Sequence, residues 1–290
     1  MKQSILIIGA DRKWEEEELL RAAKATGYTA RILDAHRLLI RLNESGAELF
    51  YEQQNITPLF KKSRIIFRRT RGTQEKMITL SLLAKHWGIP FTDTVASVMS
   101  NLNKSISMPS VHLKGKIRHI KTAFLCRGEA FDFEAFDFHF PLLVKPVHGR
   151  HGEGIKTIRN EKNLSNVLKW NRKAIMIQPF LEIESEYRIF VVGGKALGAI
   201  RKIPKKGSVI ANYAAGAQFV PAIPDEKVIQ EAITICEEQY IDIGGVDVAQ
   251  VGKHFYLLEV NRCPEFQAFS ATTGIDVAKK ITEFLIQKAS

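Results

Sequence analysis

Two short apolar runs near the end of the chain limit most strongly what this sequence can fold into. Residues 246–250 and 255–260 are mostly apolar and have a glycine-containing turn between them, a pattern typical of a β-hairpin. Asp247 lies in the first run, Glu259 in the second, and Asn261 directly after the second. Residues two apart in a strand face the same side, so Glu259 and Asn261 project together. If Asp247 lies opposite them, three oxygen-bearing side chains share one patch.

Two interpretations of this hairpin fit the spacing. Oxygen ligands of this kind suit Mg²⁺ or Mn²⁺ in a site that holds nucleotide phosphates. Alternatively, the two acids and the amide lie on the solvent side of the hairpin and bind nothing. The spacing alone does not separate these interpretations, so the rest of the chain has to be considered.

The composition is that of an ordinary globular protein. With 290 residues, 45% of them hydrophobic and 25% charged, the chain has room for two or three subdomains. No apolar run approaches the roughly 20 residues that span a bilayer, and residues 1–9 are predicted to form a first β-strand rather than a signal peptide. Cys126, Cys236 and Cys263 lack metal-type spacing. We therefore expect a reduced, cytoplasmic protein with no membrane partner.

The net charge of +11 fits either nucleic acid or an acidic substrate together with a polyphosphate. The basic residues are spread along the chain, and no motif of a DNA- or RNA-binding module accompanies them. An acidic substrate and a nucleotide are therefore favoured over nucleic acid as partners. The sequence leaves a homo-oligomer open.

The first 95 residues show the alternation of strands and helices that is typical of a parallel α/β domain. The expected strands cover residues 4–8, 30–33 and 64–67, and the expected helices cover residues 14–26 and 74–87.

Three arginines, Arg68, Arg69 and Arg71, follow the third of these strands. The carboxyl end of a strand is where open α/β sheets bind ligands, and arginines bind carboxylates by paired hydrogen bonds. A solvated surface loop would have the same composition, so both interpretations stay open.

A strand that ends in a lysine leads into a glycine-rich loop in the middle of the chain. Lys145 ends the strand, and Gly149, Gly152 and Gly154 follow. Glycines let a loop lie close to phosphates with its backbone N–H groups exposed, and the lysine adds a positive charge. Because a strand at 155–158 follows, the loop is not a Walker motif. A glycine-rich hairpin alone is also a common structural turn, but the combination predicts a phosphate site.

Two further segments complete the pattern. A strand at 175–177 runs into residues 178–181, which would offer backbone groups to an adenine edge. Arg188 and Arg201 lie on neighbouring strands of a predicted hairpin with a Gly-Gly turn. A buried pair of arginines is costly unless it meets anions, so this hairpin is expected to face negative charge.

The chain contains, in this order, a lysine-ended strand, a glycine loop, a hinge strand, an arginine hairpin and the motifs Gly-Val-Asp and Leu-Glu-Val-Asn. This ordered set resembles the ATP-grasp superfamily. Within that superfamily it is similar to the RimK-like carboxylate–amine ligases. The resemblance covers roughly residues 97–288, and residues 2–95 match more weakly the domain that precedes it. It implies an α/β and α+β fold in three parts. These are a pre-ATP-grasp α/β domain at 1–95, a central subdomain with the phosphate loop at 96–177, and a C-terminal subdomain with the metal and substrate site at 178–290.

The resemblance also implies roles for individual residues. Nucleotide binding falls on two lysines, the glycine loop, the hinge and two further polar residues, namely Lys104, Lys145, Gly149, Gly152, Gly154, Gln178, Pro179, Phe180, Leu181, Glu186 and Asn212. Asp247, Glu259 and Asn261 match the ligands of the magnesium ions, of which two are expected. Arg188 and Arg201 would be catalytic, with Lys202 in reserve.

The implied chemistry is a two-step ligation. ATP phosphorylates a carboxylate, ADP leaves, and an amine attacks the acyl phosphate. The expected substrates are a glutamate-like amino acid and a peptide, protein or small amine. The alternative is a regulatory module that binds ATP on the same fold without ligation.

Several departures from the family pattern fall where substrates would bind. Gly245 stands where the D-alanine–D-alanine ligases carry an arginine, which favours the RimK-like branch. Residues 262–266, Arg-Cys-Pro-Glu-Phe, replace the usual Ser-Pro-Gly ending, and their Glu-Phe pair is similar to LysX-type amino-acid ligases. The roles of Cys263 and Glu265, and the identity of the substrates, stay open.

Overall fold

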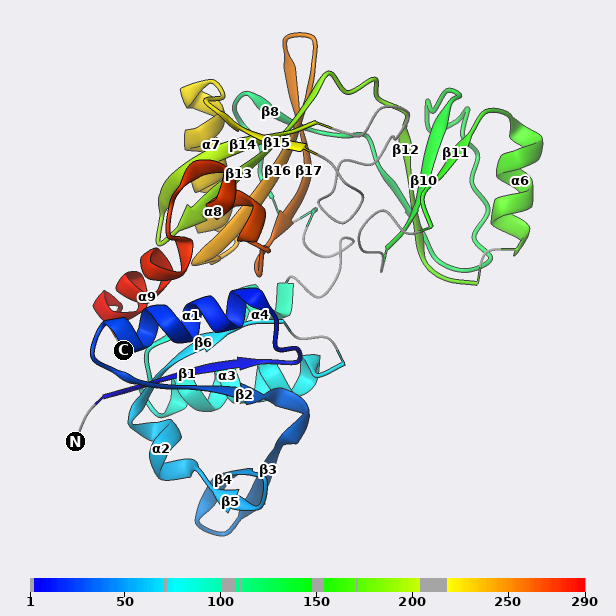
Figure 1. Ribbon diagram of the computed structural model, residues 1–290. Helices are drawn as coiled ribbons and strands as arrows, with labels where there is room; N and C mark the ends of the chain where they lie inside the picture. Colours follow the sequence, from blue (N-terminus) through cyan, green and yellow to red (C-terminus); the bar gives the residue numbers. More distant parts are fainter. Residues whose placement is uncertain are drawn as a thin grey trace.

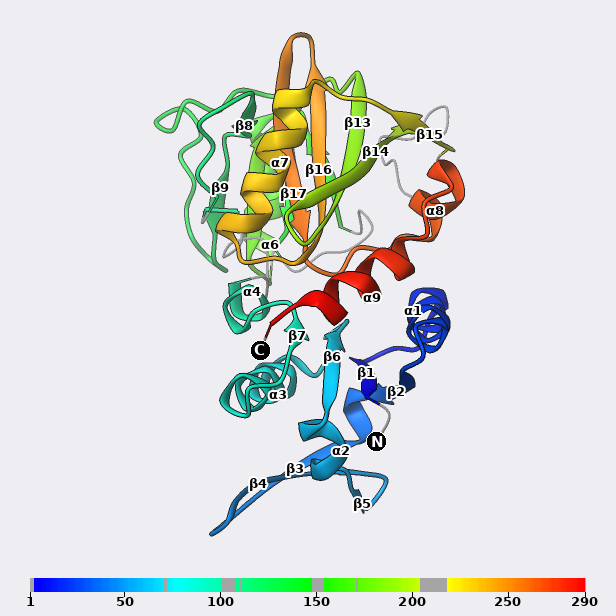
Figure 2. The same cartoon turned by 90° about the vertical axis from the view of Figure 1, so that its left-hand side faces the viewer.

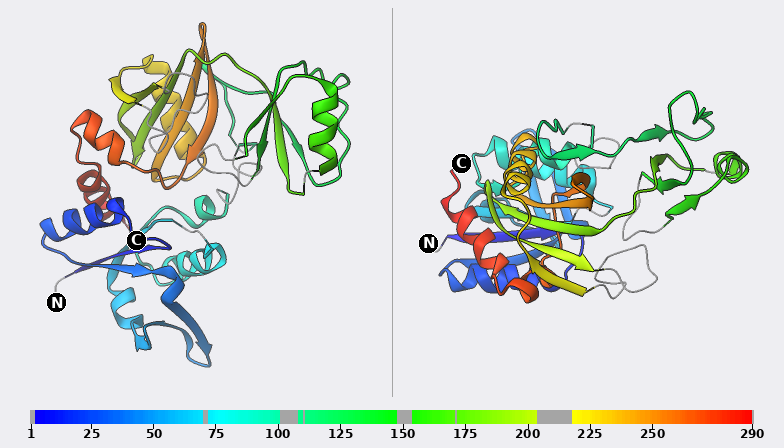
Figure 3. Two further views of the ribbon diagram at one scale, coloured as in Figure 1. Left: turned by 45° about the vertical axis from the view of Figure 1, so that its right-hand side comes forward. Right: turned by 90° about the horizontal axis from the view of Figure 1, so that it is seen from above.

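The computed structural model describes residues 3–69, 72–100, 108–109, 111–147, 154–170, 172–203 and 218–289. Its elements form three bodies (Figure 1): an N-terminal α/β domain, a small sheet with helix α6, and a larger sheet with helices α7, α8 and α9. The small sheet extends to one side of the larger sheet, which is also seen from above in Figure 3. None of the helices in these ranges is long and apolar enough to cross a membrane.

The N-terminal domain is built on a four-stranded sheet in which all neighbours run parallel. The strand order is β2 (Thr29–Asp34), β1 (Ser4–Gly9), β6 (Ser63–Phe67) and β7 (Phe91–Thr92), accompanied by helices α1 (Trp14–Ala25), α3 (Gln74–His86) and α4 (Val95–Ser100). The expected parallel α/β organisation is thereby confirmed.

Strand β1 is buried on both faces because helices cover both sides of this sheet. Ile5 and Ile7 share a core with Leu19 of α1, whereas Leu6 and Ile8 share another core with Leu80 of α3. A strand buried on both faces is continuously apolar, which explains the uninterrupted Ile-Leu-Ile-Ile run.

A second, antiparallel sheet follows β2 and was not indicated by the sequence patterns. It consists of β3 (Leu38–Asn43), β4 (Gly46–Tyr51) and β5 (Gln54–Asn55), with the short helices η1 (Ala35–Arg37) before it and α2 (Thr57–Lys61) after it. This sheet lies at the end of the molecule remote from the other two bodies (Figure 1).

The small central sheet is antiparallel. Its order is β11 (Lys156–Ile158), β10 (Leu142–Pro146), β12 (Ile175–Pro179) and β9 (Ala123–Leu125). Helix α6 (Glu161–Trp170) covers one face, where Leu164 joins a core with Val144 and Ile177. The opposite face is turned toward the larger sheet (Figure 1, Figure 3).

The larger sheet has six strands. Their order is β15 (Gln218–Ala222), β14 (Lys195–Ile203), β13 (Ser185–Val192), β16 (Ile243–Val251), β17 (His254–Asn261) and β8 (Ile117–His119), antiparallel except for β8 on β17. Helix α7 (Glu226–Glu238) packs on one face. Strand β8 shows that residues 117–119, in the segment expected to be central, pair with this sheet.

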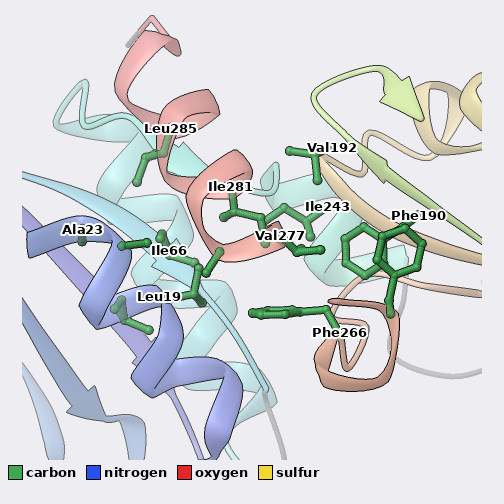
Figure 4. Close-up of a cluster of buried hydrophobic side chains, with 14 of the residues drawn as sticks. Leu19, Ala23, Ile66, Phe190, Val192, Ile243, Phe266, Val277, Ile281 and Leu285 are labelled. Carbon is green, nitrogen blue, oxygen red and sulfur yellow. The ribbon is translucent and has the colours of Figure 1, made fainter. Parts of the chain in front are cut away.

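The N-terminal domain and the larger sheet share one hydrophobic core. Helix α9 (Val277–Gln287) packs against α1, and α8 (Gln267–Thr273) packs against β14 and β15. Figure 2 shows α9 between the two bodies. In Figure 4, Leu19 and Ile66 of the N-terminal domain meet Ile281 of α9, and Phe190 and Phe266 extend the same cluster. This core fixes the larger sheet against the N-terminal domain.

Candidate active site

The hairpin of β16 and β17 is confirmed, and its register places Asp247 directly opposite Glu259. Asn261 lies opposite Gly245. Directly opposed residues share a face of an antiparallel pair, so the two acids and the amide lie on the same face. Asn261 Nδ2 donates a hydrogen bond to Glu259 Oε1 at 2.8 Å.

A β-bulge produces this alignment. From the turn, Val251 pairs with His254 and Val248 with Leu257, but the register then shifts by one residue before Asp247 pairs with Glu259. A regular ladder would have put Leu258 opposite Asp247. A shift of one residue moves every following side chain to the other face of the sheet. The bulge therefore puts the Glu259 carboxylate on the same face as Asp247.

Asp247 is the centre of a buried group of charges from three adjacent strands. Arg188 lies opposite it on β13 and donates Nε and Nη2 to its two oxygens, both at 2.7 Å. Lys202 of β14 donates to Asp247 Oδ2 at 2.7 Å and also pairs with Glu186. These four residues, Glu186, Arg188, Lys202 and Asp247, are called the active-site cluster below.

Lys202, rather than Arg201, lies beside Arg188. Arg201 pairs with Tyr187 and is exposed, on the face of the sheet opposite to Asp247. Here too a bulge is responsible, because the register of β13 and β14 shifts between Phe190 and Val191. Without that shift Arg201 would lie opposite Glu186, on the same face as Arg188. The catalytic role of Arg201 stays a prediction. Lys202 occupies the position beside Arg188 that was expected for Arg201.

A signal for this second bulge exists in the sequence. Gly198 has φ of +148° in the interior of β14, a backbone conformation that L side chains rarely adopt. A glycine inside a strand pattern often marks a bulge.

The ion pairs determine the protonation of the cluster. Burial by itself raises the pKa of the Asp247 carboxyl, but the charges and hydrogen bonds of Arg188 and Lys202 outweigh burial and lower that pKa to about 2. Burial opposes the Arg188 charge, yet Asp247 raises the pKa of the guanidinium. For Glu186 burial prevails over the attraction of Lys202, so its pKa is raised. Asp247 is therefore ionised at neutral pH.

The donors on this face fit a magnesium ion that is shared with a nucleotide. A carboxylate has about four lone-pair directions, so three N–H donors do not exhaust those of Asp247. In the described ranges, no group of three or more His, Cys, Asp or Glu side chains could hold a metal ion. Mg²⁺ would therefore need Asn261 and phosphate oxygens besides Asp247 and Glu259, and binding through one or two carboxylates plus phosphates is its usual mode.

The charge balance supports the same fit. Two positive side chains, Arg188 and Lys202, and three negative ones, Glu186, Asp247 and Glu259, lie on this face. Their net charge of −1 suits a cation, and the two bases suit the anionic groups that a cation would bring with it.

The predicted nucleotide residues of the central sheet lie on one face of that sheet. Lys145 of β10 lies opposite Met176 of β12, and Gln178 follows two residues later on the same face. Lys145 and Gln178 alternate along their strands with the residues that pack on α6, so they lie on the other face of the sheet. Gln178 is buried, donates Nε2 to Thr122 Oγ1 at 2.8 Å, and has a buried Oε1 with no hydrogen-bond partner among the described residues. This face is the one turned toward the larger sheet (Figure 1).

The remaining predicted nucleotide residues are only partly described. Pro179 ends β12, Phe180 N donates to Pro141 O at 3.0 Å, and Leu181 follows at the exit from the small sheet. Lys104, Gly149, Gly152 and Asn212 lie outside the described residues, so the structure does not place them.

Gly154, the last glycine of the predicted phosphate loop, has a positive φ of +75°. A Cβ at this position would lie 2.8 Å from Pro146 Cγ. The loop therefore needs a glycine where it returns to the end of β10.

The arginines after β6 are buried in ion pairs. Arg69 Nη1 donates to both oxygens of Glu16, at 2.7 and 2.9 Å, and Nη2 donates to Glu15 at 2.9 Å. Arg68 Nε donates to Glu16 at 3.2 Å and Nη2 to Pro264 O at 3.3 Å. For these two residues the interpretation as a solvated loop is wrong, and protein carboxylates hold the guanidinium of Arg69. Arg71 lies outside the described residues.

The segment after β17 lies between the hairpin and the N-terminal domain. A Cβ at Gly245 would come within 2.9 Å of Pro264 Cβ, so this segment packs closely over the glycine and leaves no room for a side chain there. Glu265 Oε1 accepts from Lys13 and from Arg69, both at 3.4 Å. Local sequence does not reveal these contacts, because the partners are about 200 residues or more apart.

The comparisons with known proteins agree with this geometry. The model of the RimK-like ATP-grasp domain matches residues 73–285. A protein of Nitrosococcus oceani named a probable alpha-L-glutamate ligase is 24% identical, with 100% of this chain and 97% of that protein covered. One of the same name from Mannheimia succiniciproducens is 27% identical, with 93% of each covered.

Solved structures show the same fold. The ATP-grasp ligase PsnB in complex with a variant of its minimal precursor, Mg and ADP has a TM-score of 0.74 at 16% identity, with 99% of this chain and 98% of that chain covered. A RimK domain protein from Sphaerobacter thermophilus has a TM-score of 0.68 at 16% identity, with 97% and 98% covered. The three bodies described above form an ATP-grasp fold.

Proposed function

The chain belongs to the RimK-like ATP-grasp family, and on this premise we propose that it is an ATP- and Mg²⁺-dependent ligase that joins a carboxylate to an amine through an acyl phosphate. The observation that carries the proposal is the face of the larger sheet where Asp247 opposes Glu259 and is flanked by Arg188 and Lys202. Such a face combines metal ligands with fixed positive charge. The relatives are named ligases, which favours ligation over a regulatory module without turnover.

The metal and the cluster have complementary tasks. Asp247, Glu259 and Asn261 would hold Mg²⁺, which neutralises charge on the β- and γ-phosphates when bound. Arg188 and Lys202 are held in place by their carboxylate partners, so they need no reorganisation to stabilise negative charge on the transferred phosphoryl group. Catalysis on this scheme rests on positioning and electrostatics.

We also propose that the face of the small sheet turned toward the larger sheet binds the nucleotide, with Lys145 at the phosphates and Gln178–Leu181 along the adenine. The family resemblance assigns Lys104, Gly149, Gly152, Gly154 and Asn212 to the same nucleotide. Glu186 is proposed to contact ribose, and its ion pair with Lys202 also orients that lysine.

The substrates are proposed to be a glutamate-like amino acid and the amine of a peptide, protein or small molecule. Support comes from the relatives, which are named probable alpha-L-glutamate ligases, and from PsnB, which has been solved in complex with a precursor peptide. A cytoplasmic location is part of the proposal, since Cys126, Cys236 and Cys263 are free cysteines.

The test is release of ADP and phosphate from ATP and Mg²⁺ with a panel of amino acids and short peptides. The wild type should release ADP only when a suitable carboxylate is present. Glu259→Gln removes a metal ligand, so turnover should fall by about 100-fold or more. Glu283→Gln, which loses only exposed contacts with Lys279 and Lys280, is the matched control. Full activity of Glu259→Gln would refute the metal assignment, and ATP binding without ligation of any substrate would favour the regulatory module.

A further inference from the structure

One buried carboxylate of the N-terminal domain joins both ends of the metal-binding hairpin. Asp93, which directly follows β7, is fully buried. Its Oδ1 accepts hydrogen bonds from the backbone N–H groups of Asp242 at 2.8 Å and Ile243 at 3.1 Å, where β16 begins. Its Oδ2 accepts from Arg262 Nη1 at 3.0 Å, directly after β17 ends.

Arg262 continues the connection to the N-terminal sheet. Its Nη2 donates to the backbone oxygen of Arg68 at 3.2 Å, just beyond the end of β6, and its side chain is 7% exposed. Arg262 is the neighbour of Asn261 in the chain, and Ile243 lies four residues before Asp247. The two strands that carry the proposed metal ligands are thus tied, through one carboxylate and one guanidinium, to the same point of the N-terminal domain.

We propose that Asp93 and Arg262 are positioning residues that set the geometry of the metal ligands Asp247, Glu259 and Asn261. The inference rests on the proposed function, since it concerns the same metal site. Metal ligands depend on the groups that orient them, and loss of such a supporting group typically weakens metal binding by about 10- to 100-fold. The Asp93–Arg262 pair supports the strand ends rather than the ligand side chains, so its effect acts through the backbone of the hairpin.

A second contact between the N-terminal domain and the C-terminal part of the chain provides a matched control for a role in stability alone. Arg64 of β6 donates Nη1 to the backbone oxygens of Leu285 at 2.9 Å and Lys288 at 2.8 Å. Like Arg262, it joins the N-terminal sheet to the C-terminal part of the chain. Unlike Arg262, it contacts the end of α9 and not the hairpin. A role limited to stability predicts equal consequences for the two arginines.

The experiment compares Arg262→Gln, Arg262→Lys and Arg64→Gln with the wild type. ATP binding is measured by calorimetry with Mn²⁺ and with EDTA, without any carboxylate substrate, and the melting temperature of each variant is recorded. Arg262→Gln is expected to weaken the Mn²⁺-dependent part of ATP binding by about 10- to 100-fold and to leave binding in EDTA unchanged. Arg262→Lys, which retains a positive charge for Asp93, should recover part of the loss. Arg64→Gln should lower the melting temperature and leave both binding constants unchanged.

Equal binding losses in Arg262→Gln and Arg64→Gln, or a lower melting temperature of Arg262→Gln without weaker Mn²⁺-dependent binding, would overturn the inference. Failure of the proposed function gives a different result. A wild type that binds Mn²⁺ and ATP but ligates nothing leaves the positioning role intact if Arg262→Gln still weakens that binding. A wild type without metal-dependent ATP binding would overturn both.

Discussion

Among the residues that the structure describes, two groups of side chains each combine two acids with two bases, and they differ in what they face. The active-site cluster consists of Glu186, Arg188, Lys202 and Asp247. The second group, called the interdomain cluster, consists of Glu15 and Glu16 in the first turn of α1 and Arg68 and Arg69 after β6.

Exposure separates the two clusters. In the interdomain cluster no side chain is more than 8% exposed. Carboxylates and the backbone oxygen of Pro264 accept hydrogen bonds from the two guanidinium groups, while Arg68 Nη1 is buried without a hydrogen-bond partner among the described residues. In the active-site cluster Asp247 and Lys202 are 4% and 6% exposed, whereas Arg188 and Glu186 reach 20% and 18%. All four side chains of the interdomain cluster are buried. The active-site cluster is buried at its base and open at its edge, next to Glu259 and Asn261.

The same residue types therefore serve two purposes. A closed group of buried charges is costly to break, because a lone charge remains in a medium of low dielectric constant. An open group keeps charge available for a ligand while its inner ion pairs hold the side chains in place. Arginine content along the chain does not distinguish the two, and only the surroundings of each guanidinium do.

The largest difference between the active-site cluster and the interdomain cluster is expected when Lys202 is replaced. Lys202→Met should lower kcat by about 100- to 1000-fold, because one fixed positive charge beside Asp247 is lost. Steady-state ADP release with saturating ATP and carboxylate measures the effect. ATP binding should change much less than kcat if Lys202 acts mainly in phosphoryl transfer.

Arg201→Met is the matched variant, since Arg201 is adjacent in sequence but exposed on the opposite face. Its effect on kcat should be far smaller than that of Lys202→Met. A larger loss in Arg201→Met would contradict the assignment drawn from the register and restore the one that the sequence pattern predicts.

A substitution in the interdomain cluster should lower the stability of the fold and leave the ligation chemistry unchanged. Arg69→Met leaves Glu15 and Glu16 buried with less compensating charge, so the free energy of unfolding should fall by about 3–5 kcal/mol. Urea denaturation followed by circular dichroism measures the change, and the fraction that remains folded should bind ATP and Mg²⁺ as the wild type does.

A surface ion pair that also involves helix α1 provides the control for Arg69. Arg21 Nη2 donates to Asp276 Oδ2 at 2.9 Å, and the two side chains are 53% and 40% exposed. Exposed pairs contribute only about 0–1 kcal/mol, so Arg21→Met should cost far less than Arg69→Met. Similar costs for the two variants would show that burial of the interdomain cluster does not matter.

Apart from the Arg21 control, the smallest expected effect is the pH dependence that Asp247 adds to stability. Its folded-state pKa of about 2 lies below the ordinary value of 3.8, so the ionised form stabilises the fold. The contribution is fully present above about pH 4 and is lost as the pH falls toward 2, and it amounts to about 2 kcal/mol.

Urea denaturation at a series of pH values between 2 and 7 measures this contribution. Asp247→Asn should flatten the acid side of the stability profile relative to the wild type. Asp242 has the opposite sign, because burial raises its pKa to about 6, so its contribution is present below pH 4 and is lost as the pH rises through 6. A wild-type profile unchanged by Asp247→Asn would contradict the ion pairing of the active-site cluster.

Much of the fold follows from the order of residues. The uninterrupted apolar run at Ile5–Ile8 requires a strand with both faces covered, and the alternation of strands and helices that follows it predicts a parallel sheet. The turn at Gly252 and the apolar runs around it likewise predict the hairpin of β16 and β17. These features are local, since a strand or helix repeats every two or 3.6 residues and the pattern is complete within one element.

Which side chains meet at the active site depends on two β-bulges. Without the shift between Asp247 and Val248, Glu259 would be on the opposite face from Asp247; without the shift between Phe190 and Val191, Arg201 would replace Lys202. The glycine at 198 indicates one bulge, but its size and direction arise only when the strands pair. Because a strand has a period of two, one extra residue exchanges the two faces, and the packing of both faces against their cores selects which register is stable. The residue types of a magnesium-nucleotide site are thus present in the sequence, and the tertiary structure selects the members of that site.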